Sequence, residues 1–303
     1  MEQGVLARKM VCPGPAINGE RPFFCGNDML LKNVNDRLDG KSWRCRKVHK
    51  VTKKDMTYIV RDVKVSIRKN SWLEYSKLTL EEIIEFIYLW SYGYKRKDIM
   101  HELSFTNKTV SEWSWFCRET CMAFMLQNCD KIGGQGIEVE IDESKFGRRK
   151  YYRGKKVTGQ WIMGGREKED KSKVFMVPVH DRSAKTLVPI IERWIEKGSI
   201  IHSDCWKAYS RVRCCGYKHL TVNHSKTFKD KKTGACTNKI ESDWRHAKVS
   251  LPTYGVRKGH HASYLAEFMW RRKYHDSDKF IHLIHNLTDM YTKKMITCCP
   301  LDA

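Results

Sequence analysis

The chain has 303 residues, and its 57 Lys and Arg outnumber its 35 Asp and Glu, which gives a formal net charge of +22. A charge of this size predicts a polyanionic partner such as nucleic acid, while ten Trp and thirteen Tyr exclude a disordered basic tail. No run of about 18 apolar residues exists, and the start, MEQGVLARKMVCPG, lacks the apolar core of a signal peptide. We therefore expect a soluble, intracellular protein with no membrane partner, nuclear if the host is a eukaryote.

Residues 1–65 are predicted to form a small β module. The segment MLLKNVNDRLDGKSWRC is typical of a hairpin, because Asp39 and Gly40 suit its turn. Four potential soft ligands surround it with the spacing C-x12-C-x19-C-x3-H, namely Cys12, Cys25, Cys45 and His49. This set indicates a degenerate zinc ribbon with one structural Zn²⁺. Neither paired CxxC knuckle is present, so three reduced thiols and a surface histidine remain the alternative.

Residues 66–130 are predicted to be a helix-turn-helix domain. LTLEEIIEFIYLWSYG is an amphipathic helix with Thr79 as its N-cap and Glu82 as the capping-box partner. RKDIMHEL gives a short second helix, residues 104–107 a turn, and KTVSEWSWFCRETCMAFML a longer third helix. In a helix-turn-helix this third element enters the major groove. An ordinary three-helix bundle is the alternative.

The start of the third helix carries the side chains that are expected to contact DNA, because recognition helices usually make their base and phosphate contacts from this end. The candidate DNA-binding residues are Asn107, Lys108, Thr109 and Ser111. Cys117 and Cys121 lie one helical turn apart further along the helix and are expected to be core thiols rather than ligands.

Residues 131–290 are predicted to form an α/β catalytic domain, followed by a tail at 291–303. GIEVEIDES, KKVTGQWIMGGRE and KVFMVPVHD are three consecutive strands. After them come the helix AKTLVPIIERWIEKG, the strand SIIHSD, the short helix CWKAYSRVRCC, the strand HLTVNH, a polar insertion, a helix from residue 238 and a final helix, SYLAEFMWRRKY. This order predicts a mixed five-stranded sheet with helices, as in the ribonuclease H-like fold.

Three acidic residues stand where that fold would bring side chains together. Asp142 ends the run GIEVEID, Asp204 ends SIIHSD, and Glu241 opens the helix in TNKIESDW. Carboxylates at strand ends and on a nearby helix can hold divalent cations, and such hard oxygen ligands suit Mg²⁺ or Mn²⁺. Any one of these acids alone would more often be a solvated structural residue.

The context of the acids favours the metal-binding interpretation. In GIEVEID, Glu138, Glu140 and Asp142 share one face of a strand whose other face is apolar. Such a stack of like charges is costly unless cations answer it. The helix from residue 238 has an apolar side and an opposite stripe. The apolar side is Ile240, Trp244, Ala247 and Leu251, and the opposite stripe is Asn238, Glu241, Arg245 and Lys248.

Several separate motifs occur in order: IDESKFGRRKYYRGK, HSDCWKAYS, TVNHSKTF, TNKIESDWRHAK and a helix that ends EFMWRRKY. In these motifs, over residues 135–275, the chain resembles the DDE transposases of Merlin DNA transposons and related bacterial insertion sequences. The helix-turn-helix and the DGKSWRC hairpin are similar to the family more loosely. The resemblance implies Asp142, Asp204 and Glu241 as the catalytic triad and two Mg²⁺ or Mn²⁺ ions as cofactors.

The resemblance also implies the reaction and the partners. One ion, bridged by Asp142 and Asp204, would activate a water for attack on the phosphodiester, and a second, between Asp142 and Glu241, would stabilise the departing 3′ oxygen. The freed 3′-OH then attacks target DNA. The expected partners are double-stranded DNA, as terminal inverted repeats and as target, and further copies of the chain in a homodimer or higher homo-oligomer.

Other residues near the acids have expected roles in holding DNA. Asn238, Arg245 and Lys248 are expected to contact the phosphates of the strand. His224 is a candidate contact to the scissile phosphate, although a lone histidine is more often structural. Glu143 points to the other face of its strand and is the least expected metal ligand.

Two other functions are compatible with these residues. A domesticated, transposase-derived DNA-binding regulator would keep the same fold, although an intact triad argues against it. A non-transposing, metal-dependent nuclease would also keep it, although a dedicated helix-turn-helix favours a protein that returns to one DNA sequence.

Overall fold

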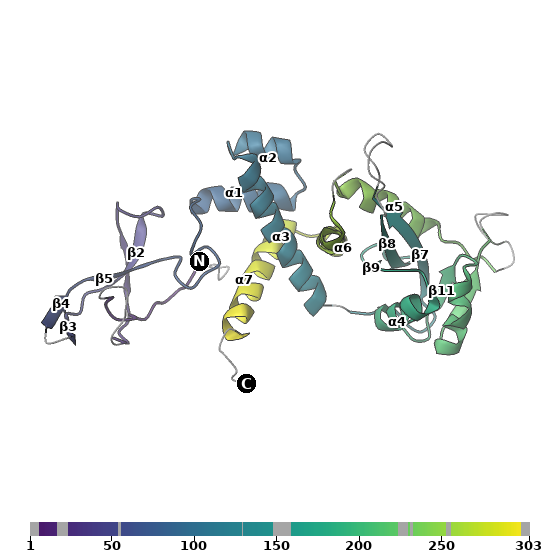
Figure 1. Ribbon diagram of the computed structural model, residues 1–303, viewed down its shortest axis with the longest axis horizontal. Coiled ribbons are helices and arrows are strands. Elements are labelled where there is room, and N and C mark those ends of the chain that lie inside the picture. Colours follow the sequence, from purple (N-terminus) through teal and green to yellow (C-terminus); the bar gives the residue numbers. More distant parts are fainter. Residues whose placement is uncertain are drawn as a thin grey trace. The chain divides into compact units, whose positions relative to one another are not determined.

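The computed structural model describes residues 6–16, 24–53, 56–128, 130–147, 159–223, 230, 233–252 and 256–297. Contacts divide the chain into two units, residues 1–112 with 280–303, and residues 113–279; Figure 1 labels many of their elements. The predicted division at residues 65, 130 and 290 stays a prediction. Among the helices in the described ranges, none is both long and apolar enough to cross a membrane.

The first unit begins with five short strands. Their bounds are β1 Leu30–Asn33, β2 Lys41–Cys45, β3 His49–Lys53, β4 Met56–Val60 and β5 Val63–Ser66. β1, β2 and β5 form an antiparallel sheet in that order, and β3 pairs with β4. β1 and β2 confirm the predicted hairpin. In its turn Gly40 has a φ of 61° and donates its N–H to Arg37 O, a conformation that favours glycine.

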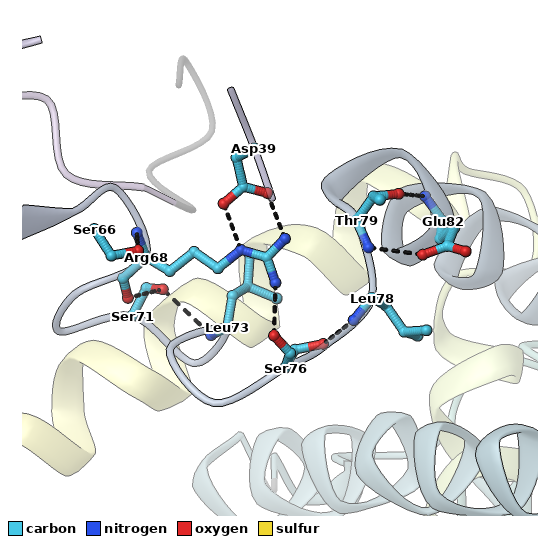
Figure 2. Close-up of polar contacts among 9 residues, drawn as sticks. All are labelled: Asp39, Ser66, Arg68, Ser71, Leu73, Ser76, Leu78, Thr79 and Glu82. Carbon is cyan, nitrogen blue, oxygen red and sulfur yellow. Dashed lines mark hydrogen bonds and ion pairs between the residues drawn. The ribbon is translucent and has the colours of Figure 1, made fainter. Parts of the chain in front are cut away.

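A buried ion pair ties this hairpin to the segment that leads to the first helix. Arg68 donates through Nε to Asp39 Oδ2 at 2.7 Å and through a second nitrogen to Asp39 Oδ1 (Figure 2). Its remaining nitrogen donates to Ser76 O at 3.1 Å. The two side chains are only 4% and 7% exposed, so their charges depend on this bidentate geometry. The turn residue Asp39 thus has a second, tertiary role.

Three helices follow, α1 Leu80–Ser91, α2 Arg96–Glu102 and α3 Asn107–Gln127, the last of which continues into the second unit. The predicted capping box is confirmed: the Glu82 N–H donates to Thr79 Oγ1 at 3.1 Å, and the Thr79 N–H donates to Glu82 Oε2 at 2.7 Å (Figure 2). The apolar residues buried among these elements include Ile83, Phe86, Ile87, Ile99, Phe105 and Val110. The predicted order of short helix, turn and longer helix is therefore present.

The second unit is built on a mixed five-stranded sheet with the order β12-β11-β7-β8-β9. The strands are β7 Glu138–Phe146, β8 Gln160–Glu167, β9 Val174–Val179, β11 Ile200–Ser203 and β12 Lys218–Thr221, and a separate short pair joins β6 Ile132–Gly133 to β10 Ile195–Glu196. β11 runs parallel to β7 and to β12, whereas β8 is antiparallel to β7 and β9. The predicted mixed sheet is confirmed.

The helical elements of this unit are α4 Ala184–Trp194, η2 Lys207–Cys215, α5 Asn238–Ser250, η3 Lys258–His260 and α6 His261–Lys273. The short helix predicted after Asp204 is a 3₁₀ helix, η2. The prediction that α6 is the final helix is wrong, because α7 Lys279–Thr297 follows and belongs to the first unit from Phe280 onward. Leu283, Leu287 and Met290 are buried at helical spacing, and this apolar spacing was the signal for α7.

Two adjacent glycines in β8 let side chains approach opposite faces of the sheet. A Cβ on Gly164 would lie 2.6 Å from the Trp244 ring of α5, and a Cβ on Gly165 would lie 2.4 Å from the Phe175 ring. Phe175 stacks on Trp194 of α4, with 5.3 Å between ring centroids. Since successive strand residues point to opposite faces, α5 covers the Gly164 face and α4 the Gly165 face (Figure 1).

Candidate active site and thiol cluster

The pairing of β7 and β11 brings two of the predicted acids to neighbouring positions on the sheet. The two strands run parallel, and His202 lies opposite Glu140 in the last pair of their register. Asp204 and Asp142 are each two residues further along, so the same register leads them to neighbouring positions. Asp204 directly follows β11, but Asp142 lies in the middle of β7, which continues to Phe146, so the prediction that Asp142 closes its strand is wrong. Asp142 also pairs with Gly164 across β8, which places it on the face covered by α5.

Asp142 is held against α5 and is surrounded by negative charge. The indole Nε1 of Trp244 donates to Asp142 Oδ2 at 3.0 Å. Burial raises the pKa of Asp142 from 3.8 to about 6, the Trp244 hydrogen bond opposes this shift, and the nearby charges of Asp204 and Glu241 add to it. The three predicted acids therefore interact electrostatically, and a bound cation would relieve their mutual repulsion.

Glu241 lies in the first turn of α5, where Thr237 Oγ1 donates to its Oε1 at 3.1 Å. The two predicted faces of this helix are present: the apolar set is at most 7% exposed, and the opposite stripe is exposed. That exposed stripe consists of Asn238, Glu241, Arg245 and Lys248. Glu241 and the two basic residues thus share the solvent side of α5.

The three acids are spaced more widely than the ligands of one small ion. Within the described part of the chain, the only set of three or more His, Cys, Asp or Glu whose ligand atoms all lie within 4.8 Å of one another is the thiol cluster of the first unit. Repulsion between like charges favours such spacing. Hard carboxylate oxygens fit Mg²⁺ or Mn²⁺. In the predicted arrangement, Asp142 would share one ion with Asp204 and another with Glu241.

Glu140, the middle carboxylate of the strand, anchors α5 and is not free for a metal. It is fully buried, and its Oε2 accepts the backbone N–H groups of Lys239 at 2.8 Å and Ile240 at 3.1 Å. The helix has no side-chain N-cap of its own at Thr237, so a carboxylate from the sheet satisfies its N-terminus. This contact fixes the start of α5, and with it Glu241, relative to β7.

A second contact, made by Asp243, fixes the first turns of α5 from its apolar side. Asp243 is 1% exposed and pairs with Arg166 of β8 at 3.3 Å and with Arg272 of α6. Helical spacing places Asp243 three residues after Ile240 and four before Ala247, on the apolar side. A buried aspartate at such a position requires charged partners, and this was the signal in the sequence that could have identified its role.

The three carboxylates on one face of β7 thus have three different kinds of partner. Glu138 pairs with Lys168 and lies 3.3 Å from His202 Nε2, Glu140 accepts helix N–H groups, and Asp142 accepts an indole N–H. The expectation that cations neutralise all three carboxylates is therefore wrong for Glu140, because backbone N–H groups at the N-terminus of α5 donate hydrogen bonds to it. The charges of Asp204 and Glu241 help to raise the pKa of Asp142.

Glu143, the least expected ligand, lies on the opposite face and accepts a hydrogen bond from the hydroxyl of Tyr209 in η2. Burial raises the pKa of Glu143 to about 7, and the charges of Asp142 and Asp204 contribute while Arg182 opposes the shift. A fourth carboxylate therefore borders the site from the α4 side of the sheet.

The predicted DNA contacts on this unit have defined positions, with one exception. Lys248 donates from Nζ to Ser144 Oγ at 2.7 Å and lies over the Phe146 ring, and Arg245 and Asn238 are exposed. His224 lies outside the described residues. Lys248 is thus held above the strand that carries Asp142, on the same face.

In the first unit, the four predicted soft ligands come together. The ligand atoms of Cys12, Cys25, Cys45 and His49 all lie within 4.8 Å of one another, and three of these residues are buried. Asn27 Nδ2 donates to Cys25 Sγ at 2.8 Å. His49 Nε2 lies 3.9 Å from Cys12 Sγ, and its Nδ1 lies 3.4 Å from Val60 O. These contacts orient the ligands as the surroundings of a zinc site do, so the donor set fits Zn²⁺.

The predicted recognition residues lie at the start of α3. Asn107 and Lys108 are exposed, and Lys108 Nζ is 3.8 Å from Glu112. Thr109 donates its N–H to Thr106 Oγ1 at 3.2 Å, which caps the helix, and Ser111 Oγ donates to Asn107 O and accepts from Arg96. The side chain of Ser111 is therefore engaged within the protein.

Cys117 and Cys121 are fully buried and burial raises the pKa of each well above its ordinary value, as expected of core thiols.

The raised pKa of Asp142 predicts how stability depends on pH in the absence of metal. Because the folded state binds this proton more tightly than the unfolded state, the free energy of unfolding falls as pH rises from about 4 to 6. Asp142→Asn should therefore stabilise the metal-free protein at pH 7.5 by about 1–3 kcal/mol. Denaturant unfolding with EDTA at pH 5 and pH 7.5 measures this, and Mg²⁺ should stabilise the wild type but not the variant. A variant that is less stable than wild type at pH 7.5 contradicts the prediction.

Comparisons with known proteins bear on the second unit. Residues 133–273 match the family described as an ISXO2-like transposase domain, a range that contains Asp142, Asp204 and Glu241. An uncharacterized transposase-like protein of Haemophilus influenzae is 33% identical over 102 residues, which is 33% of this chain and 81% of that protein. These matches support the transposases of insertion sequences and do not single out the Merlin group.

One solved structure, described as the crystal structure of a pre-cleavage Mos1 transpososome, aligns with 73% of this chain and 80% of its own. The two sequences are 8% identical, and the TM-score of the alignment is 0.19. The conclusion rests on the bacterial relative and on the family match over the sheet and its helices: the chain belongs to the ISXO2-like transposase family.

Proposed function

We propose that the chain is a cut-and-paste DNA transposase that binds terminal inverted repeats, hydrolyses the phosphodiester at each transposon end and joins the free 3′-OH to target DNA. The observation that carries the proposal is that Asp142 on β7 interacts electrostatically with Asp204 and Glu241 in a transposase-family domain. The motifs that resemble Merlin transposases favour that group within the family.

The strand order supports a ribonuclease H-like catalytic fold. Three antiparallel strands, β7 to β9, come first, and β11 and β12 are added in parallel on the other side of β7. Such a fold places its first acid on the first strand, the second after the fourth strand and the third on the following helix. Asp142 on β7, Asp204 after β11 and Glu241 on α5 occupy these three places.

The roles of the residues follow from their positions. Asp142 with Asp204, and Asp142 with Glu241, would each hold a divalent cation, and the pair of cations would supply Lewis acidity for hydrolysis of the phosphodiester. Glu140 and Asp243 hold α5 so that Glu241 stays near Asp142. Lys248 and Arg245 offer positive charge to the phosphates of the bound strand. Reaction at two ends would require two copies of the chain.

DNA cleavage by the purified chain tests the proposal. The protein is incubated with Mg²⁺ and duplexes that carry candidate inverted repeats, and the products are sequenced. A transposase nicks at the repeat boundary and joins that 3′ end to a second DNA. Cleavage without joining would instead identify a non-transposing nuclease, and binding without cleavage a DNA-binding regulator.

Recognition of the repeat is proposed to come from the start of α3. Lys108→Ala and Thr109→Ala should weaken binding to the repeat by roughly 1–3 kcal/mol for each good base contact that is lost, and should weaken binding to random DNA less. Titration of both DNAs at one salt concentration measures the difference, because phosphate contacts depend on salt. Lys185→Ala, at an exposed position of α4, is the control. Equal losses on both DNAs would mean that these residues touch phosphate only.

A further inference from the structure

Two tryptophans and an arginine form an aromatic cluster in the second unit, defined here as Trp161, Arg182 and Trp206. The Arg182 guanidinium carbon lies over the Trp161 ring, 4.0 Å from its centroid, and over the Trp206 ring, 4.6 Å from its centroid. Lys145 Nζ lies 5.4 Å from the Trp161 centroid. The cluster therefore combines two indole rings with one cation, and Lys145 adds a second positive charge beside it.

Trp206 is both exposed and rigidly held. The residue is 40% exposed, yet its Nε1 donates to Arg182 O at 3.1 Å. Apolar surface of the indole that a partner covers adds to binding, and a side chain fixed in advance loses little entropy on binding. The exposed ring surface is thus prepared for a flat, apolar partner.

The cluster borders the acids. The backbone N–H of Trp206 donates to Asp204 Oδ1 at 2.9 Å, and the charge of Arg182 acts on Glu143, which itself is affected by Asp142 and Asp204. A molecule stacked on Trp206 would therefore lie beside the carboxylates, and not at a remote surface.

We propose that the aromatic cluster binds an unpaired nucleobase of the DNA next to the scissile phosphate, with the base stacked on Trp206. Nucleobases stack on exposed indole and guanidinium surfaces in a sequence-tolerant way, and the positive charge of Arg182 and Lys145 suits the adjoining phosphates. A paired base keeps both faces inside the duplex, so the base must leave its pair to reach the ring. This inference rests on the proposed function.

The test compares two repeat duplexes that differ only in whether the nucleotide pair beside the scissile phosphate is matched or mismatched. Cleavage is measured in single turnover with Mg²⁺ for wild type, Trp206→Ala, Trp206→Phe and Trp115→Ala. Trp115 is a matched control, because the residue is 38% exposed and its ring lies against His260.

Trp206→Ala should cleave the matched duplex roughly ten- to a hundredfold more slowly, a loss expected from one stacking contact, and should recover most of its rate on the mismatched duplex. Trp206→Phe should stay near wild type, and Trp115→Ala should be unchanged on both. A loss by Trp206→Ala that is equal on the two duplexes, or no loss on either, would overturn base binding while leaving the transposase proposal intact. If the wild type cleaved neither duplex, the proposed function itself would fail and this inference with it.

Discussion

Asp142→Asn, Asp204→Asn and Glu241→Gln are each expected to reduce DNA cleavage and strand transfer by about a thousandfold or more. A metal ion supplies several kcal/mol of stabilisation to the charge that develops in phosphodiester hydrolysis, and each of these substitutions removes a carboxylate that we propose as a metal ligand. Binding to the repeat should persist or tighten slightly, because one negative charge near the phosphates is gone. Cleavage in Mg²⁺ and binding of the same variants to the repeat measure the two effects.

Glu169→Gln is the matched control for these variants. Glu169 is 90% exposed and pairs with Lys239 at 3.3 Å, so its substitution removes a carboxylate from the same unit without touching the acids. It should cleave at the wild-type rate. If any one of the three acid variants also cleaves at that rate, that acid is not a metal ligand in the reaction.

Cys45→Ser is expected to remove a bound Zn²⁺ and to unfold the β module of the first unit. Cys45 is 2% exposed and packs in the core with Cys12 and Trp43. A module this small depends on its metal for stability, and structural Zn²⁺ contributes on the order of 10 kcal/mol to such folds. Wild type should carry about one Zn²⁺ per chain, measured by metal analysis, and the variant none, with a matching loss of β signal in circular dichroism.

Cys214→Ser is the control for the thiol change, since Cys214 is exposed and lies in η2; it should keep its metal. Cys45→Ser should still cleave repeat DNA at high protein concentration, because the acids belong to the other unit. A fully folded wild-type protein that carries no zinc would contradict the ribbon and leave a module held by Trp43 and its apolar neighbours.

Much of the fold could be predicted because local patterns specify it. The capping box of Thr79 and Glu82 and the two faces of α5 depend on spacing within one helix, and the structure has both. The mixed sheet follows from the order of its strands. The four soft ligands were predicted as a set, and the structure brings them together, because Cys and His in a small β module have few other roles.

The remaining contacts could not be predicted because they join residues far apart in sequence. Glu140 was interpreted as one of three like carboxylates, yet it anchors α5 a hundred residues later. Asp243 meets Arg166 and Arg272 only when β8 and α6 pack on α5. Trp206 contacts Arg182 only because the fold brings these two residues together. In each case the sequence specifies the residue, but tertiary packing selects its partner.

The most direct test of the central claim is the anomalous scattering of Mn²⁺ in crystals of the protein bound to repeat DNA. We expect Mn²⁺ bound to carboxylate oxygens of Asp142, with one ion shared with Asp204 and another with Glu241. The same crystals of Asp142→Asn should lose both peaks. Mn²⁺ bound elsewhere, with the three carboxylates making only protein contacts, would contradict the account.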